Sequence, residues 1–149
     1  MQIHITPPFE IVQAVGAIII AFSYISLSSL VKEPERKKLS AIILGGAGAA
    51  YLSSGFGGWE FAFCTLMTFI AYKGLKHYYL IGIGWLLHTS WDIAHHLYAN
   101  PIVVMAPSSS LGCAICDPIM AIWFFMGAPD VFKRFRKNQP QKELSGPVY

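Results

Sequence analysis

The residues best suited to chemistry lie close together near the end of one apolar segment, in the string WLLHTSWDIAHHLY. In a helix, which turns 100° per residue, the side chains of His88, Asp92 and His95 fall within about 60° of one another. His96 lies about 40° further round the same helix. Imidazole and carboxylate groups together are ligands of divalent transition metals such as zinc, iron or copper. The spacing therefore predicts a metal site with these four residues as ligands, although Asp92 could instead orient a ligating histidine.

Two cysteines form a second group, in the string SSSLGCAICDP. The spacing of Cys113 and Cys116 is that of metal ligands and equally that of a redox-active dithiol. Thiols in an apolar segment also serve as plain packing groups, so three interpretations stay open. Asp117 and Pro118 follow directly, and this pair is typical of a helix start with Asp as the N-cap. We therefore expect a helix that begins there, with the preceding segment folded back as a loop over the histidines.

A third carboxylate, Glu60, follows the string GGW at the start of another apolar segment. It could reach the same cavity as a general acid/base or as a ligand. Equally, it could serve only to favour the positive amino end of its helix. Asp117 is the other candidate for general acid/base. Together with Cys113 and Cys116, these two carboxylates make up the predicted catalytic set.

The composition places these groups in an apolar setting. The chain has 149 residues, of which 54% are hydrophobic and 13% are charged, and its mean hydropathy is +0.49. Soluble domains carry about 25% charged residues, so we expect an all-α bundle in a membrane rather than a globule in water. Three cysteines are too few for a disulfide scaffold. The positive charges fall in short clusters rather than on one face, which argues against nucleic-acid binding.

Five apolar stretches approach the roughly 20 residues with which an α-helix crosses a bilayer core about 30 Å thick. These stretches are residues 8–31, 39–56, 59–72, 78–98 and 111–132. All eleven Lys and Arg residues lie between the first two stretches, between the third and fourth, or after the fifth. Five transmembrane helices would therefore place every one of these charges on one side, which the positive-inside rule identifies as the cytoplasm. The N-terminus then faces out and the C-terminus in.

We expect one transmembrane helical domain over residues 1–135 and a flexible cytoplasmic tail over residues 136–149, which is polar and contains Pro and Gly. The candidate site residues fall in the outer halves of the spans, so the site is expected to face the periplasmic side. Ionisable side chains inside a membrane are costly and usually mark function. The string GGAGAA in the second span favours close helix packing, either within one chain or in a homodimer.

Three blocks of the sequence carry a resemblance to a known family. They are GGWEFAF, GIGWLLHTSWDIAHHLYANPIV and APSSSLGCAICDPIMAIWFFMGAP. Over roughly residues 30 to 130, the chain resembles a family of short bacterial multi-pass membrane proteins that is catalogued as a domain of unknown function. The resemblance implies a protein of the bacterial inner (cytoplasmic) membrane and supplies no reaction.

The chain is also loosely similar to the quinone-linked thiol oxidoreductases of the vitamin K epoxide reductase and DsbB type. Those enzymes hold a C-x-x-C at the outer end of a helix in a small bundle, where Cys113 and Cys116 are expected here. They also use a second cysteine pair, which this sequence lacks, because Cys64 is its one other cysteine. They do not need a span with the pattern H-x-x-x-D-x-x-H-H.

The leading hypothesis is a membrane-embedded enzyme with a divalent transition metal near the outer leaflet, acting on a lipid or another amphipathic small molecule. The metal would activate water for hydrolysis, or a redox metal would oxidise the substrate. The first alternative is a thiol–disulfide oxidoreductase in which Cys113 and Cys116 pass electrons to a quinone. The second is a metal-ion or proton transporter, which the absence of ionisable residues from the inner halves of the spans disfavours.

Overall fold

The computed structural model describes residues 11–52, 55–103 and 105–133. Within these ranges the chain forms five α-helices and no named strand, which confirms the expected all-α class. The helices are α1 (Ile11–Leu30), α2 (Glu35–Gly48), α3 (Gly58–Gly74), α4 (Tyr78–Leu97) and α5 (Ser109–Phe125). The tail expected over residues 136–149 lies outside the described residues.

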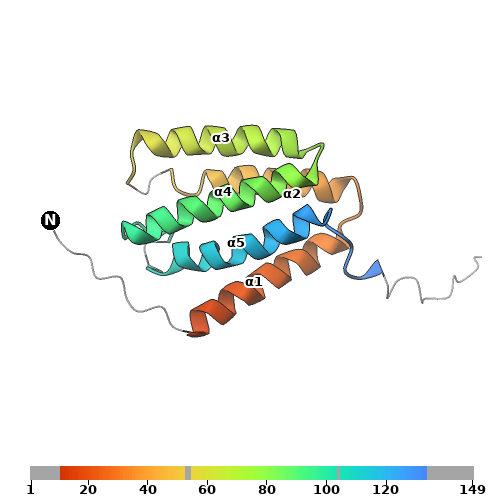
Figure 1. The fold of residues 1–149 in the computed structure, drawn as a ribbon, viewed down its shortest axis with the longest axis horizontal. Coiled ribbons are helices and arrows are strands. Elements are labelled where there is room, and N and C mark those ends of the chain that lie inside the picture. The colour runs from red at the N-terminus through yellow and green to blue at the C-terminus, as the bar shows by residue number, and fades with distance from the viewer. Residues whose placement is uncertain (1–10, 53–54, 104, 134–149) are drawn as a thin grey trace, which may run out of the picture.

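The helices alternate in direction, so their connections gather at two opposite ends of the bundle (Figure 1). One end holds the α1–α2 and α3–α4 connections and the residues that follow α5. The other end holds the α2–α3 and α4–α5 connections and the start of α1, and we call it the far end. α4 lies centrally, in contact with α2, α3 and α5, whereas α1 packs mainly on α5.

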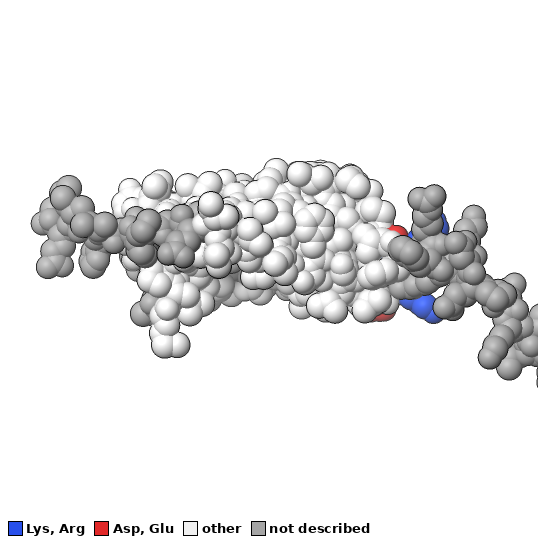
Figure 2. All heavy atoms as spheres, turned by 90° about the horizontal axis from the view of Figure 1, so that it is seen from below, with Lys and Arg blue, Asp and Glu red and all other residues white. Residues whose placement is uncertain are grey.

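Charged side chains distinguish the two ends. The described Lys and Arg residues all belong to the first end, which we call the basic end: Lys32, Arg36, Lys37, Lys38, Lys73, Lys76 and Lys133. Figure 2 shows charged atoms at that end, while the side of the bundle in view has none. Large apolar side chains are instead exposed along the helices, among them Ile19 on α1 and Phe69 on α3.

One described helix, α1, is long and apolar enough to cross a membrane by length and composition. The other predicted spans fall short of that criterion. α3 and α5 have 17 residues each, and α2 has 14 and begins with the charged string ERKK. α4 has 20 residues but includes the His and Asp side chains. A single apolar helix near an amino end also occurs in soluble proteins, so this criterion alone does not place the chain in a membrane.

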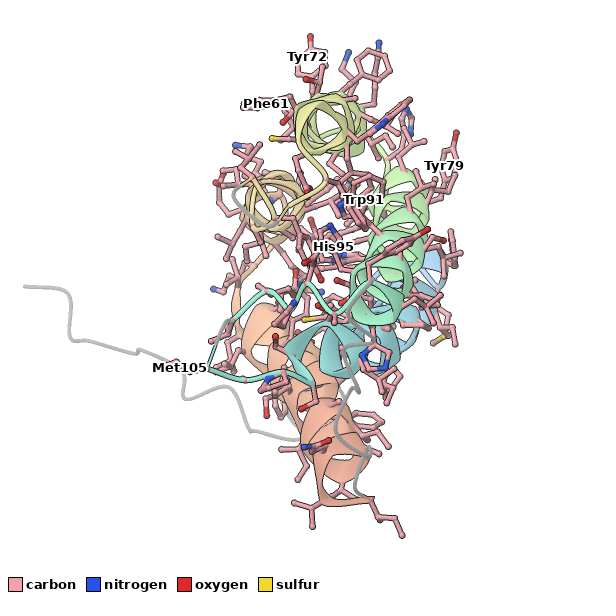
Figure 3. All side chains as sticks on the ribbon, turned by 90° about the vertical axis from the view of Figure 1, so that its left-hand side faces the viewer. Phe61, Tyr72, Tyr79, Trp91, His95 and Met105 are labelled. Carbon is pink, nitrogen blue, oxygen red and sulfur yellow. The ribbon has the colours of Figure 1, made fainter. Side chains whose placement is uncertain are left out.

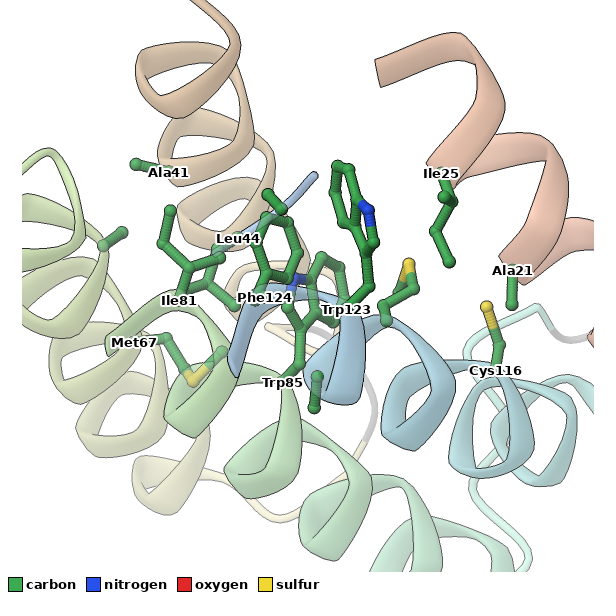
Figure 4. Close-up of a cluster of buried hydrophobic side chains, with 14 of the residues drawn as sticks. Ala21, Ile25, Ala41, Leu44, Met67, Ile81, Trp85, Cys116, Trp123 and Phe124 are labelled. Atoms are coloured by element: carbon green, nitrogen blue, oxygen red, sulfur yellow. The ribbon is translucent and has the colours of Figure 1, made fainter. Parts of the chain in front are cut away.

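Apolar side chains from all five helices form the core (Figure 4). Glycines let the helices approach closely within it. A Cβ at Gly48 would lie 2.3 Å from the Cβ of Met67. The backbone of α2 at Gly48 therefore packs directly against the Met67 side chain of α3. A Cβ at Gly84 would lie 2.4 Å from the Leu44 side chain, so α4 sits equally close to α2. Gly48 thus brings α2 close to α3, and Gly84 of α4 brings α4 close to α2.

Candidate functional site

α5 differs from the sequence-based expectation in where it begins. The predicted helix start at Asp117 is wrong, because α5 begins at Ser109 and continues through Pro118. A proline inside a helix costs about 3 kcal/mol through a lost hydrogen bond and a steric clash. Here the extensive packing of α5 on α4 outweighs that cost. The continuous helix places Asp117 on a buried face, and Cys113 and Cys116 on its first turns rather than in a loop.

Three polar side chains meet in the interior between α4 and α5. The Nδ1 atom of His88 lies 3.0 Å from Oδ2 of Asp92 and 2.8 Å from Oδ2 of Asp117. The four-residue spacing stacks the first two on one face of α4, and α5 supplies the third. None of the three residues is more than 3% exposed. We call this group the carboxylate–histidine cluster, and one ligand atom from each residue lies within 4.8 Å of the other two.

The atoms of His88 and Asp92 that do not face each other also have hydrogen-bond partners. The Nε2 atom of His88 lies 3.1 Å from the backbone oxygen of Ala47, at the end of α2. The Oδ1 atom of Asp92 accepts a hydrogen bond of 2.5 Å from the hydroxyl of Tyr51. The cluster is therefore held by α2 and the turn after it, as well as by α4 and α5.

A second polar group, the Glu60–His95 pair, lies between α3 and α4. The Nε2 atom of His95 is 3.3 Å from Oε1 of Glu60, although the angle between them is not that of a hydrogen bond. The Nδ1 atom of His95 lies 3.1 Å from the backbone oxygen of Asn100. Glu60 also accepts hydrogen bonds from Nε1 of Trp91, at 3.3 Å, and from the backbone nitrogen of Phe56, at 3.2 Å.

Tyr51 joins the two polar groups. Its hydroxyl donates to Asp92, and its ring stacks on His95 with 3.9 Å between the ring centroids. Figure 3 looks onto the far end and shows His95 and Trp91 pointing into the space between the helices. Sequence reasoning missed Tyr51, because a single tyrosine after a glycine run carries no spacing signal. Its two contacts depend entirely on how α2 packs against α4.

The structure separates the four predicted metal ligands. His88 and Asp92 come together, and Asp117, which was predicted as an acid/base, joins them. His95 lies on the same side of α4 as His88 but faces Glu60. Seven residues of helix, which rise about 10 Å, separate these two histidines along the axis. His96 is half-buried, and its Nδ1 has no hydrogen-bond partner among the described residues.

The cysteines are not among the hydrogen-bond or ion-pair partners of His88 and His95 in the described residues. Cys113 and Cys116 are free thiols and line a groove between α1 and α5, together with Gly16, Ala17 and Ser109. Cys116 is buried and Cys113 is half-buried. Cys64 is a half-buried free thiol on α3. The described structure therefore leaves the three interpretations of the C-x-x-C spacing open.

The charges of the two polar groups do not balance. Glu60, Asp92 and Asp117 supply three buried carboxylates, whereas His88 and His95 supply at most two positive charges. Among the described residues, no Lys or Arg lies at the far end to compensate. Burying uncompensated charge is costly, so a bound cation or a further proton is needed here. One nitrogen and two carboxylate oxygens are a ligand set that suits a divalent transition metal.

Comparison with known proteins identifies a family but no activity. The model of a family of unknown function, DUF6010, matches residues 12–130, which is most of the chain. No curated protein and no solved structure gives a significant match. The expected resemblance to a family of unknown function is confirmed, whereas the multi-pass membrane character expected of that family finds no support in this comparison. The looser similarity to oxidoreductases of the vitamin K epoxide reductase and DsbB type finds no support.

Proposed function

The chain belongs to this family of unknown function, and we propose that it is an integral membrane enzyme with a divalent transition metal bound to its carboxylate–histidine cluster. Its substrate would be a lipid or another amphipathic small molecule. One observation carries the proposal, namely that Nδ1 of His88 faces two buried carboxylates while Nε2 faces a backbone oxygen.

Exposed apolar side chains along the sides of the bundle support a membrane setting. Ile19 and Phe22 on α1 are 59% and 58% exposed, and Phe61 on α3 is 65% exposed. Many exposed large apolar side chains are unfavourable in water, and they mark a surface that another apolar phase covers. The 20 residues of α4 rise about 30 Å, which matches a bilayer core. By the positive-inside rule the basic end would face the cytoplasm and the far end the periplasm.

The partners of His88 supply the donor atoms that a metal site needs. A backbone oxygen can only accept, so Nε2 of His88 carries the proton in its contact with Ala47. In the neutral ring, Nδ1 then presents a lone pair beside the oxygens of Asp92 and Asp117. Three electron-rich atoms at one point attract a cation. Histidines that bind metals also commonly donate their other N–H to a backbone carbonyl.

The surrounding residues would orient the ligands and transfer protons. A bound metal supplies Lewis acidity and can activate water. Tyr51 would fix the orientation of Asp92 through the carboxylate oxygen that does not face His88. The Glu60–His95 pair, on the other side of Tyr51, would accept or donate the proton of the reaction. Glu60 keeps its predicted role in this proposal, whereas Asp117 becomes a ligand.

Metal analysis tests the proposal directly. The protein would be purified in detergent with a tag that contains no histidine, and its metal content measured by plasma mass spectrometry. We expect a stoichiometric metal in the wild type, and its loss in His88→Ala and in Asp117→Asn. His96→Ala is the matched control and should keep the metal, because His96 lies outside the cluster. Wild-type protein that stays helical and takes up no zinc, iron or copper would contradict the proposal.

A thiol–disulfide oxidoreductase is the second candidate function. It is favoured by the groove between α1 and α5, because half-buried Cys113 and buried Cys116 both line this groove, on a side that the bilayer would cover. The two thiols would form a disulfide and transfer two electrons and two protons to a quinone. Cys113→Ser would then abolish quinone reduction, whereas a metal chelator would leave it unchanged.

A further inference from the structure

Four aromatic side chains form a cup at the far end, which we call the aromatic cup. Its walls are Phe56, Trp59, Trp91 and Tyr98. The ring of Phe56 meets Trp91 and Tyr98 edge to face, with centroid separations of 5.6 and 5.3 Å. Trp59 and Tyr98 are 73% and 71% exposed, so the cup presents open ring faces to its surroundings.

A buried carboxylate lies directly behind the cup. Glu60 is 2% exposed, and it accepts hydrogen bonds from the indole N–H of Trp91 and from the backbone of Phe56. Two of the four walls are therefore fixed to one carboxylate. An indole that donates to an anion is polarised, and its ring face becomes more electron-rich. The position of Glu60 thus strengthens the negative potential inside the cup.

No described Lys or Arg side chain offsets this potential nearby. The described Lys and Arg residues are all at the basic end, a bundle length away (Figure 2). The neighbouring polar groups are the Glu60–His95 pair and the carboxylate–histidine cluster, whose carboxylates outnumber their histidines. Aromatic faces backed by negative charge are the arrangement that binds organic ammonium ions.

We infer that the aromatic cup binds the ammonium head group of a membrane lipid, such as one that ends in ethanolamine or choline. Phe61, two residues after Trp59, and Leu97, directly before Tyr98, are 65% and 74% exposed, and they would contact the acyl chains. The inference rests on the membrane setting proposed above and does not require the metal. It names the substrate class of the proposed enzyme, because a head group in the cup lies beside the Glu60–His95 pair.

Lipid retention measured by native mass spectrometry tests the inference. The protein would be released from nanodiscs that contain equal amounts of phosphatidylethanolamine and phosphatidylglycerol with identical acyl chains. We expect the wild type to retain the ethanolamine lipid about threefold or more over the glycerol lipid. Trp59→Ala and Glu60→Gln should each bring this ratio towards one. Phe69→Ala is the matched control, because it removes another exposed ring of α3 that does not line the cup.

Equal retention of both lipids by the wild type would overturn the inference, as would the same loss of preference in Phe69→Ala. The preference should survive in His88→Ala, which removes a metal ligand. The proposed metal site is thus tested by metal content, and the proposed head-group site is tested separately by lipid retention. A chain that stays folded and monodisperse in water without detergent would overturn the membrane setting, and this inference with it.

Discussion

His88 has two ring nitrogens, and the bundle gives each of them a different kind of partner. The backbone oxygen of Ala47 fixes the proton on Nε2, and the carboxylates of Asp92 and Asp117 converge on Nδ1. The hydroxyl of Tyr51 donates a hydrogen bond to Oδ1 of Asp92, the carboxylate oxygen that does not face His88. The orientation of a ligand by its own hydrogen-bond partner commonly matters almost as much as the ligand itself.

Tyr51→Phe isolates the contribution of that hydroxyl. The phenyl ring can keep the stacking on His95, while Asp92 loses its hydrogen-bond donor. We expect the affinity for the metal to fall about ten- to a hundredfold, as measured by competition with a chelating dye. Tyr79→Phe, which alters an exposed tyrosine on α4, should bind metal like the wild type. An unchanged affinity in Tyr51→Phe would show that Asp92 needs no such support.

At the scale of the elements, Gly48 of α2 and Gly84 of α4 determine how closely α2 approaches α3 and α4. The contacts of Ala47 and Tyr51 with the site follow from that approach, because both residues lie at or just after the end of α2. A change in the position of this helix end would therefore reach the site without altering any polar side chain.

Gly48→Ala tests this dependence. The new Cβ would lie 2.3 Å from the Cβ of Met67, so α2 and α3 would have to move apart. We expect a loss of about 1–3 kcal/mol in the free energy of unfolding, measured by thermal denaturation in detergent. Gly46→Ala is the matched control, because nothing lies within 4 Å of a Cβ there. It should be neutral or stabilising by about 0.5–1 kcal/mol, and equal effects of the two variants would contradict the packing argument.

The helices were largely predictable from sequence, and the site only in part. The stretch 78–98 became α4 almost unchanged, because a long and mostly apolar segment has few other ways to fold. The stretch 39–56 did not, because α2 ends at Gly48 within its glycine run. His88 and Asp92 were found because their contact is local to one helix. The contacts of Asp117 and Tyr51 join residues 29 and 41 positions apart, and no periodicity encodes such packing.

For the whole molecule, the decisive feature is the separation of charge along the bundle. The basic end carries the described Lys and Arg residues, whereas the far end carries the aromatic cup with buried Glu60 behind it, and Asp92 and Asp117 lie in the interior between α4 and α5. In a membrane these two ends would face different compartments. The metal and the lipid head group would then both reach their proposed sites from the periplasmic side.

Labelling of introduced cysteines tests this orientation. Val103→Cys at the far end and Lys76→Cys at the basic end would be compared in a chain whose native cysteines are replaced by alanine. We expect a membrane-impermeant maleimide to label Val103→Cys in intact cells, because the positive-inside rule would place the basic end in the cytoplasm and the far end outside it. Lys76→Cys should react after the membrane is opened. Labelling of both sites from outside would contradict a membrane-spanning bundle with this orientation.

The contact between His88 and the backbone oxygen of Ala47 has a consequence for how the site tolerates change. Every amino acid supplies that oxygen, so no substitution at position 47 can delete the acceptor. Variation at this position is limited by side-chain volume rather than by chemistry. A site anchored in this way is protected against point mutation at the anchor, and it is vulnerable instead to anything that bends the last turn of the helix.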